Sequence, residues 1–158
     1  MATHTPDRNQ GERFRFDTSD VDWKEFIPGA VDFRILEVNV AARTVDLLAK
    51  FAPGKQCFNH RHVAQATTLV LEGELHIIEK SAQGDVRKVK PAGSFSSGAV
   101  DEVHIEGGGV EGALVYFSLR GHSDRIYDML NEDLTLMQTI TVQDFARDWE
   151  YWLQAQAA

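Results

Sequence analysis

Short stretches rich in β-forming and apolar residues recur through the middle of the chain. Between residues 31 and 119 they are separated by Gly, Pro, Asn and Asp, which favour turns. The clearest stretches read FRILEVNV, TVDLLAKF, TLVLEGELHIIE, DEVHIEG and GALVYFSL. Their length and spacing predict antiparallel strands, arranged in an all-β sandwich or barrel.

The C-terminal end has a different period. Thr141 and Asp144 resemble a capping box, which marks the start of a helix. The apolar residues that follow recur at helical spacing: Val142, Phe145, Trp149 and Trp152. We therefore expect a helix over residues 142–154, with its apolar face packed on the sheet or on another subunit.

The N-terminal end is polar and offers few apolar anchors. This composition predicts an arm over residues 1–22, followed by one domain over residues 23–158. A chain of 158 residues has about the length of one domain, so a second independent core is not expected.

Charge and cysteine content exclude several classes. A net charge of -8 repels phosphate backbones, which argues against a nucleic-acid partner. The chain has no apolar run near the roughly 20 residues of a membrane span, and its start, MATHTPDRNQ, does not resemble a signal peptide. The single cysteine, Cys57, cannot form an internal disulfide. We expect a cytoplasmic protein that does not contact a membrane.

Three histidines carry the strongest chemical signal. His60 and His62 are two residues apart, so in a strand both imidazoles project from the same face. His104 lies in another β-type stretch that the fold can bring alongside. Three imidazoles at one point are a suitable ligand set for a divalent metal ion.

The segments around these histidines resemble the two motifs of the cupin superfamily. From Gly54 to Gly73, a glycine, five residues and His-x-His precede a strand that closes on a glycine turn. The segment Pro91-Ala92-Gly93-Ser94-Phe95, followed by His104, resembles the second motif. The resemblance covers roughly residues 30 to 120. It implies a jelly-roll β-sandwich or barrel that holds one divalent metal per chain through His60, His62 and His104.

One position departs from the usual cupin pattern. Many cupins carry a glutamate seven residues before the turn glycine, but this chain has Ala66 there. A fourth protein ligand is thus expected to be missing, although Glu102, two residues before His104, could supply a carboxylate. Gln65 and Thr68 are further candidates for contacts around the ligands or the substrate.

The three-histidine pattern resembles the acetylacetone dioxygenase-like cupins. That resemblance implies a mononuclear Fe(II) dioxygenase that cleaves a carbon–carbon bond in a β-dicarbonyl or hydroxy-ketone. Three neutral imidazoles also leave a divalent ion with its full charge, which favours a substrate bound as a chelating enolate. The metal is not fixed by this pattern, and Zn, Ni or Mn would also suit it.

Two other functions remain open. One is a non-catalytic metal-binding cupin that senses or binds a small ligand, and the other is a Lewis-acid isomerase or hydrolase that uses Zn, Ni or Mn. For the dioxygenase, the partners are a small-molecule substrate and dioxygen. We also expect a homo-oligomer, a dimer or tetramer.

The remaining expectations concern the cavity and the other polar residues. His76 and His122 are expected to lie outside the site, and Cys57 to face away from it as a buried filler. The predicted pocket lining is apolar with one hydroxyl: Phe51, Phe58, Thr68, Val70, Phe95, Val115 and Phe117.

Overall fold

The computed structural model describes residues 16–158, which form an antiparallel β-structure followed by one helix. The predicted arm over residues 1–22 falls mostly on residues outside this range, and residues 16–22 contain a turn and no strand. The strands are β1 (Lys24–Ile27), β2 (Val31–Asn39), β3 (Thr44–Phe51), β4 (His60–His62), β5 (Gln65–Glu79), β6 (Val86–Pro91), β7 (Phe95–Ser97), β8 (Val103–Arg120), β9 (Arg125–Leu130) and β10 (Leu136–Thr141).

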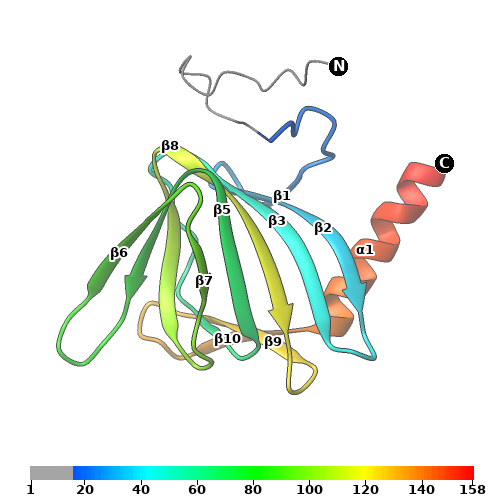
Figure 1. The fold of residues 1–158 in the computed structure, drawn as a ribbon. Helices are drawn as coiled ribbons and strands as arrows, with labels where there is room; N and C mark the ends of the chain where they lie inside the picture. Colours follow the sequence, from blue (N-terminus) through cyan, green and yellow to red (C-terminus); the bar gives the residue numbers. More distant parts are fainter. Residues whose placement is uncertain (1–15) are drawn as a thin grey trace, which may run out of the picture.

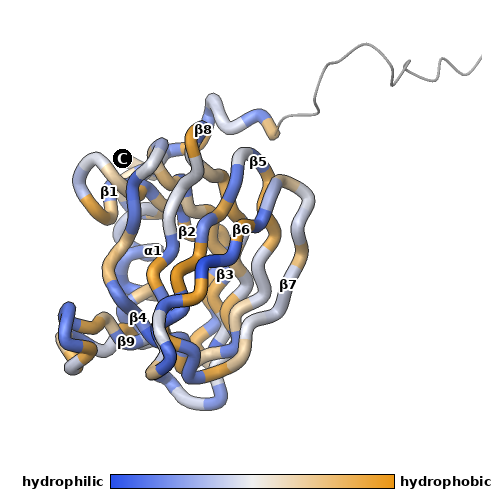
Figure 2. The backbone as a smooth tube through the Cα atoms, turned by 90° about the vertical axis from the view of Figure 1, so that its left-hand side faces the viewer, coloured by the Kyte–Doolittle hydropathy of each residue, from blue (hydrophilic) through white to orange (hydrophobic). Residues whose placement is uncertain are grey.

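The sheet curls into the barrel-like sandwich that the strand pattern predicts (Figure 1). One path of neighbouring strands runs β1-β2-β3-β8-β4-β9-β10, and β5 pairs with β6, β7 and β8. Apolar and polar positions alternate along the strands (Figure 2), so that one face of the sheet forms the core. The side chains buried deepest include Ile35, Val45, Leu75, Val115 and Ile126.

The long strand β8 organises the barrel because three strands pair with it. Its C-terminal half pairs with β3, its first residues pair with β4, and β5 runs along nearly its whole length. Gly73 lies inside β5 at a register shift, and not in a chain-reversing turn. A Cβ atom on Gly73 would lie 2.1 Å from the carbonyl oxygen of Gly112, so only glycine allows this close approach of the two strands.

The C-terminal helix α1 (Val142–Ala157) begins where the sequence predicts and extends three residues beyond the predicted end at 154. The Thr141 side chain accepts a hydrogen bond from the backbone N–H of Asp144, and the Asp144 side chain accepts one from the backbone N–H of Thr141. A cap of this kind stabilises a helix by about 1 kcal/mol.

Helix α1 lies on the outside of the sheet beside β2 (Figure 1). Trp152 packs against Phe33, with ring centroids 5.3 Å apart, and the cations of Lys24 and Arg34 lie over its ring. The helix therefore packs on the sheet of its own chain. No helix within residues 16–158 is long and apolar enough to cross a membrane.

Candidate metal centre

Four buried side chains from two neighbouring strands converge inside the barrel. Strand β4 contributes His60 and His62, and β8 contributes His104 and Glu106. His60 is directly opposite His104 in the strand register, so their side chains share a face. Residues two apart in a strand also share a face, which brings in His62 and Glu106. Each of the four is 7% exposed or less.

The donor atoms lie at separations that suit a single bound ion. The Nε2 atoms of His60 and His62 are 3.1 Å apart. The Glu106 carboxylate lies 3.5 Å from Nε2 of His60 and 3.5 Å from Nε2 of His104. Ligands that each bind a metal at about 2.0–2.1 Å are themselves roughly 3 Å or more apart. Donor atoms from all four residues lie within 4.8 Å of one another.

Unpaired nitrogens support the same interpretation. Within residues 16–158, Nδ1 of His62 and Nε2 of His104 are buried and have no hydrogen-bond partner. Leaving a buried polar atom unpaired is costly, and a metal ion bound to Nε2 of His104 would remove part of that cost. The residues present thus fit a divalent metal bound by three imidazoles and one carboxylate.

Contacts behind the ligands fix how two of the imidazoles are turned. Nδ1 of His60 lies 3.2 Å from the carbonyl oxygen of Phe58, and Nδ1 of His104 lies 2.9 Å from Oε1 of Glu102. Each contact suits an Nδ1–H that donates, which leaves Nε2 free to bind a metal. Glu102 therefore orients His104 from behind and is not part of the four-residue cluster. Its side chain is still 28% exposed, because it precedes the start of β8.

Glu106 is the site residue that the sequence expectations lack. Its signal is its spacing from His104, since the pair repeats the i, i+2 arrangement of His60 and His62. The usual cupin position for the carboxylate lies on β5, where this chain has Ala66. The sequence predicts no fourth protein ligand, whereas the structure places a carboxylate from β8 in the cluster as a fourth candidate.

Cys57 also lies differently from the expectation. A regular strand from residue 57 onward would turn Cys57 away from the site, but β4 begins only at His60, so the alternation of faces does not hold before it. The Cys57 sulfur lies 3.6 Å from Nδ1 of His60 and accepts a hydrogen bond from the backbone N–H of Glu106 at 3.3 Å. Cys57 therefore contacts both ligand-bearing segments.

Gln65 does not contact the ligand histidines. It is exposed at the start of β5, and its side-chain nitrogen donates to the hydroxyl of Ser97 at 3.0 Å. The neighbouring inward position belongs to the buried Ala66, so the alternation of the strand turns Gln65 outward.

An apolar cavity of about 280 Å³ opens beside the cluster. His60, His62 and Glu106 line it together with residues from β1, β2, β3, β8, β9, β10 and α1. Three of the predicted lining residues, Phe51, Phe58 and Phe117, are part of its wall. The metal cluster thus faces a space surrounded mainly by aromatic and aliphatic side chains.

The other four predicted lining residues are not part of this wall. Thr68, Val70 and Val115 are buried inside the barrel but do not line the cavity. Phe95 is 70% exposed. It is paired with Leu69, which lies between the inward positions of β5, so Phe95 projects outward with its partner.

The pKa values of His60, His62 and Glu106 are shifted in different directions, because these side chains are buried and lie close to other titratable groups. Burial, together with the neighbouring His60, lowers the pKa of His62 to about 3. Burial also opposes charge on His60 and on Glu106, but other contacts outweigh it. Cys57 and Glu106 raise the pKa of His60 well above its ordinary value, and His104 and His60 hold the pKa of Glu106 well below its ordinary value.

These pKa directions predict that metal binding depends on pH. In the metal-free protein His60 keeps a proton at neutral pH, whereas Glu106 is ionised and His62 is neutral. A metal must displace the His60 proton, so below the raised pKa of His60 the affinity should fall about tenfold for each unit of acidification. Calorimetric Zn(II) titrations in buffers of different ionisation enthalpy should show release of about one proton per metal. Equal heats in those buffers would contradict this protonation scheme.

The shape of the barrel agrees with solved cupin structures. An acetylacetone dioxygenase from Acinetobacter johnsonii matches with a TM-score of 0.70 at 10% identity, over 95% of this chain and 99% of that one. A candidate acetylacetone dioxygenase from Methylibium petroleiphilum PM1 gives 0.69 at 17% identity, over 87% and 94%. An RmlC-like cupin protein from Ralstonia eutropha JMP134 gives 0.68 at 14% identity, over 88% and 85%. At these identities the likeness shows a shared fold.

A sequence family gives the more direct assignment. No curated protein sequence matches the chain. Residues 11–123, well over half of the 158, match the family described as the ChrR Cupin-like domain. This range contains all four members of the buried cluster. The chain therefore belongs to the ChrR Cupin-like domain family of the cupin superfamily.

Proposed function

We propose that this protein is a metal-dependent dioxygenase that cleaves a carbon–carbon bond in a β-dicarbonyl or hydroxy-ketone substrate. The observation that carries the proposal is the buried cluster of His60, His62, His104 and Glu106 facing an apolar cavity of about 280 Å³. The structural similarity to two proteins described as acetylacetone dioxygenases supports the same chemistry.

The charge of the cluster favours a monoanionic ligand. Three neutral imidazoles and one carboxylate would leave a divalent ion with one net positive charge in a low-dielectric cavity. An enolate neutralises that charge. Three imidazoles alone would leave the ion with its full double charge. Glu106 would halve this charge, and the site would still favour an anionic ligand.

Four protein ligands also leave room for a chelating substrate. His60, His62, His104 and Glu106 would hold the ion, and the oxygens of a β-dicarbonyl enolate would approach it from the cavity. When bound, Fe(II) would supply Lewis acidity toward the enolate and redox reactivity toward dioxygen.

The protein itself would orient and shield the substrate. The phenylalanine walls, Phe51, Phe58 and Phe117, exclude water and have no proton to transfer. Glu102 and the Phe58 carbonyl keep the ligand imidazoles turned toward the ion. In the overall reaction the bond beside a carbonyl breaks and each fragment takes one oxygen atom from dioxygen. The substrate supplies the four electrons, so no separate reductant is needed.

The test is an oxygen-electrode assay of protein loaded with Fe(II) or with Zn(II). The panel contains 1,3-diketones, β-keto esters and aryl hydroxy-ketones. We expect oxygen uptake only with the Fe(II) protein, one dioxygen consumed for each substrate cleaved, and both oxygen atoms of labelled dioxygen in the products. The absence of uptake across the panel would reject the dioxygenase and leave a ligand-binding cupin.

A Lewis-acid isomerase or hydrolase is the second candidate, and Glu106 is the observation that favours it. A carboxylate beside three imidazoles gives Zn or Mn four protein ligands without any need for a redox-active ion. Turnover of the same panel by the Zn(II) protein, without oxygen uptake, would support this candidate in place of the dioxygenase.

A further inference from the structure

The phenol of Tyr127 is a polar group of the cavity wall that lies close to the metal cluster. Tyr127 lies on β9 directly opposite His62 of β4, so the two side chains share a face. Its ring centroid lies 6.2 Å from that of His60 on one side and 6.1 Å from that of Phe145 on the other. Tyr127 therefore lines the cavity between the metal cluster and helix α1.

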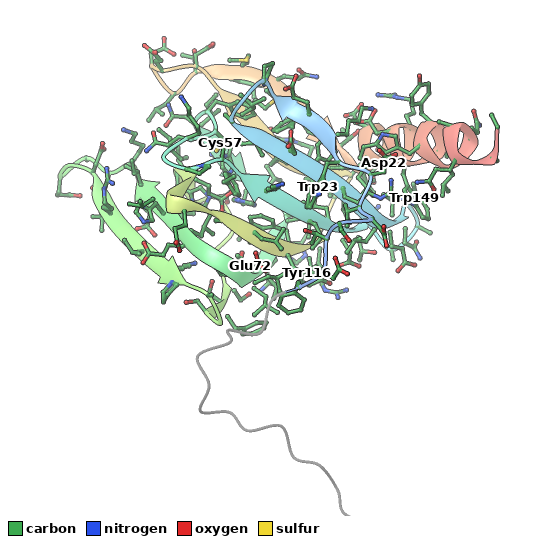
Figure 3. All side chains as sticks on the ribbon, turned by 90° about the horizontal axis from the view of Figure 1, so that it is seen from above. Asp22, Trp23, Cys57, Glu72, Tyr116 and Trp149 are labelled. Carbon is green, nitrogen blue, oxygen red and sulfur yellow. The ribbon has the colours of Figure 1, made fainter. Side chains whose placement is uncertain are left out.

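The hydroxyl of Tyr127 has no hydrogen-bond partner within residues 16–158, unlike the hydroxyl of Tyr116. Tyr116 lies on β8 and donates to Oδ1 of Asp46 at 2.9 Å. It does not line the cavity, and Figure 3 shows it well away from Cys57, which does. A phenol in an apolar wall without a protein partner is a hydrogen-bond donor available to a ligand.

The surroundings of Tyr127 restrict what such a ligand can be. On one side are His60, His62 and Glu106, where an anionic oxygen-bearing group would bind a metal. Phe51, Phe58 and Phe117 form an aromatic part of the wall, and the side toward β10 and α1 also carries polar groups: Gln138, Asp144, Arg147 and Asp148. The hydroxyl of a phenol can donate a hydrogen bond to such a ligand.

We propose that the Tyr127 hydroxyl donates a hydrogen bond to an oxygen of the metal-bound substrate, and that the substrate is an enolate with an apolar, aryl-sized substituent. This inference rests on the proposed function and identifies a residue that selects the substrate there. The enolate oxygens lie between the cluster and Tyr127. The substituent packs among Phe51, Phe58 and Phe117.

The experiment measures ligand binding without turnover. Fe(II)-loaded protein under nitrogen is titrated with 1-phenyl-1,3-butanedione, and the charge-transfer absorption is followed. Wild type is compared with Tyr127→Phe, which removes only the hydroxyl, and with Tyr116→Phe as the matched control. A second titration uses imidazole. One of its nitrogens binds a metal and the other carries a hydrogen, so metal-bound imidazole cannot accept a hydrogen bond from a phenol.

We expect Tyr127→Phe to weaken diketone binding about 10- to 100-fold, as the loss of a hydrogen bond to a charged oxygen does. Imidazole affinity and metal content should stay at wild-type values, and Tyr116→Phe should match wild type throughout. Replacing the phenyl group of the diketone by methyl should also weaken binding to the wild type.

Three outcomes would overturn the inference, and they can be told apart. Equal diketone affinity in wild type and Tyr127→Phe would show that the hydroxyl does not contact the substrate. Loss of metal or of imidazole binding in Tyr127→Phe would show that Tyr127 supports the metal site instead. If wild type binds imidazole but no diketone, the proposed function itself fails, and the role of Tyr127 fails with it.

Discussion

Replacing His104 by alanine is expected to abolish stoichiometric metal binding, and so are the same changes at His60 and His62. Each removes a ligand from a cluster whose donor atoms lie within 4.8 Å of one another. The loss in affinity should exceed the roughly 10- to 100-fold that removal of an outer contact costs. Metal analysis of protein purified without chelators and then dialysed measures the change.

His76→Ala and His122→Ala are the matched controls for this series. His76 pairs with Glu74 at 3.1 Å, and His122 is exposed in the turn after β8. Neither belongs to the buried cluster, so both variants should retain about one metal per chain. A His104→Ala protein that kept its metal would contradict the proposed centre.

Glu106→Gln is expected to have the second largest effect, because it removes the negative charge from the cluster but keeps its shape. The amide is a weaker metal ligand, and the divalent charge would then be balanced by imidazoles alone. Glu102→Gln should be milder, with a loss of about 10- to 100-fold, because Glu102 acts only through Nδ1 of His104.

The order of these two variants distinguishes a ligand from an outer contact. Zn(II) affinity measured by competition with a chelator should fall more in Glu106→Gln than in Glu102→Gln. Circular dichroism of both metal-free proteins shows whether the fold is intact. The reverse order, with Glu102→Gln losing more, would identify Glu102 as the ligand and remove Glu106 from the centre.

The sequence predicts the class of fold and the convergence of the three histidines because both depend on strand alternation. It does not predict which carboxylate joins them. Glu102 and Glu106 are both in phase with His104, so alternation alone cannot choose between them. The choice is made by where β8 begins, at Val103, which places Glu106 inside the barrel and leaves Glu102 at its edge.

The cavity wall is harder to predict because it depends on strand ends and on distant pairings. Strand alternation gives the wrong face for Cys57 because β4 begins three residues after it, at His60. Phe95 faces outward because it pairs with Leu69, a partner that no local pattern reveals. Tyr127 lines the cavity because β9 pairs with β4, and this pairing is a property of the whole topology.

The short strand β4 has a consequence for how the barrel is held together. In the path of strands it alone joins β9 and β10 to β8, and its pairing with β8 covers only His60 and Arg61. The backbone pairing at this junction is therefore short, and the buried side chains of Ile126 and Leu130 on β9 add packing that the hydrogen bonds do not supply. An ion bound by His60, His62, His104 and Glu106 would bridge β4 and β8 directly. Its binding free energy would then also be local folding free energy, so metal occupancy would strengthen the short pairing between β4 and β8.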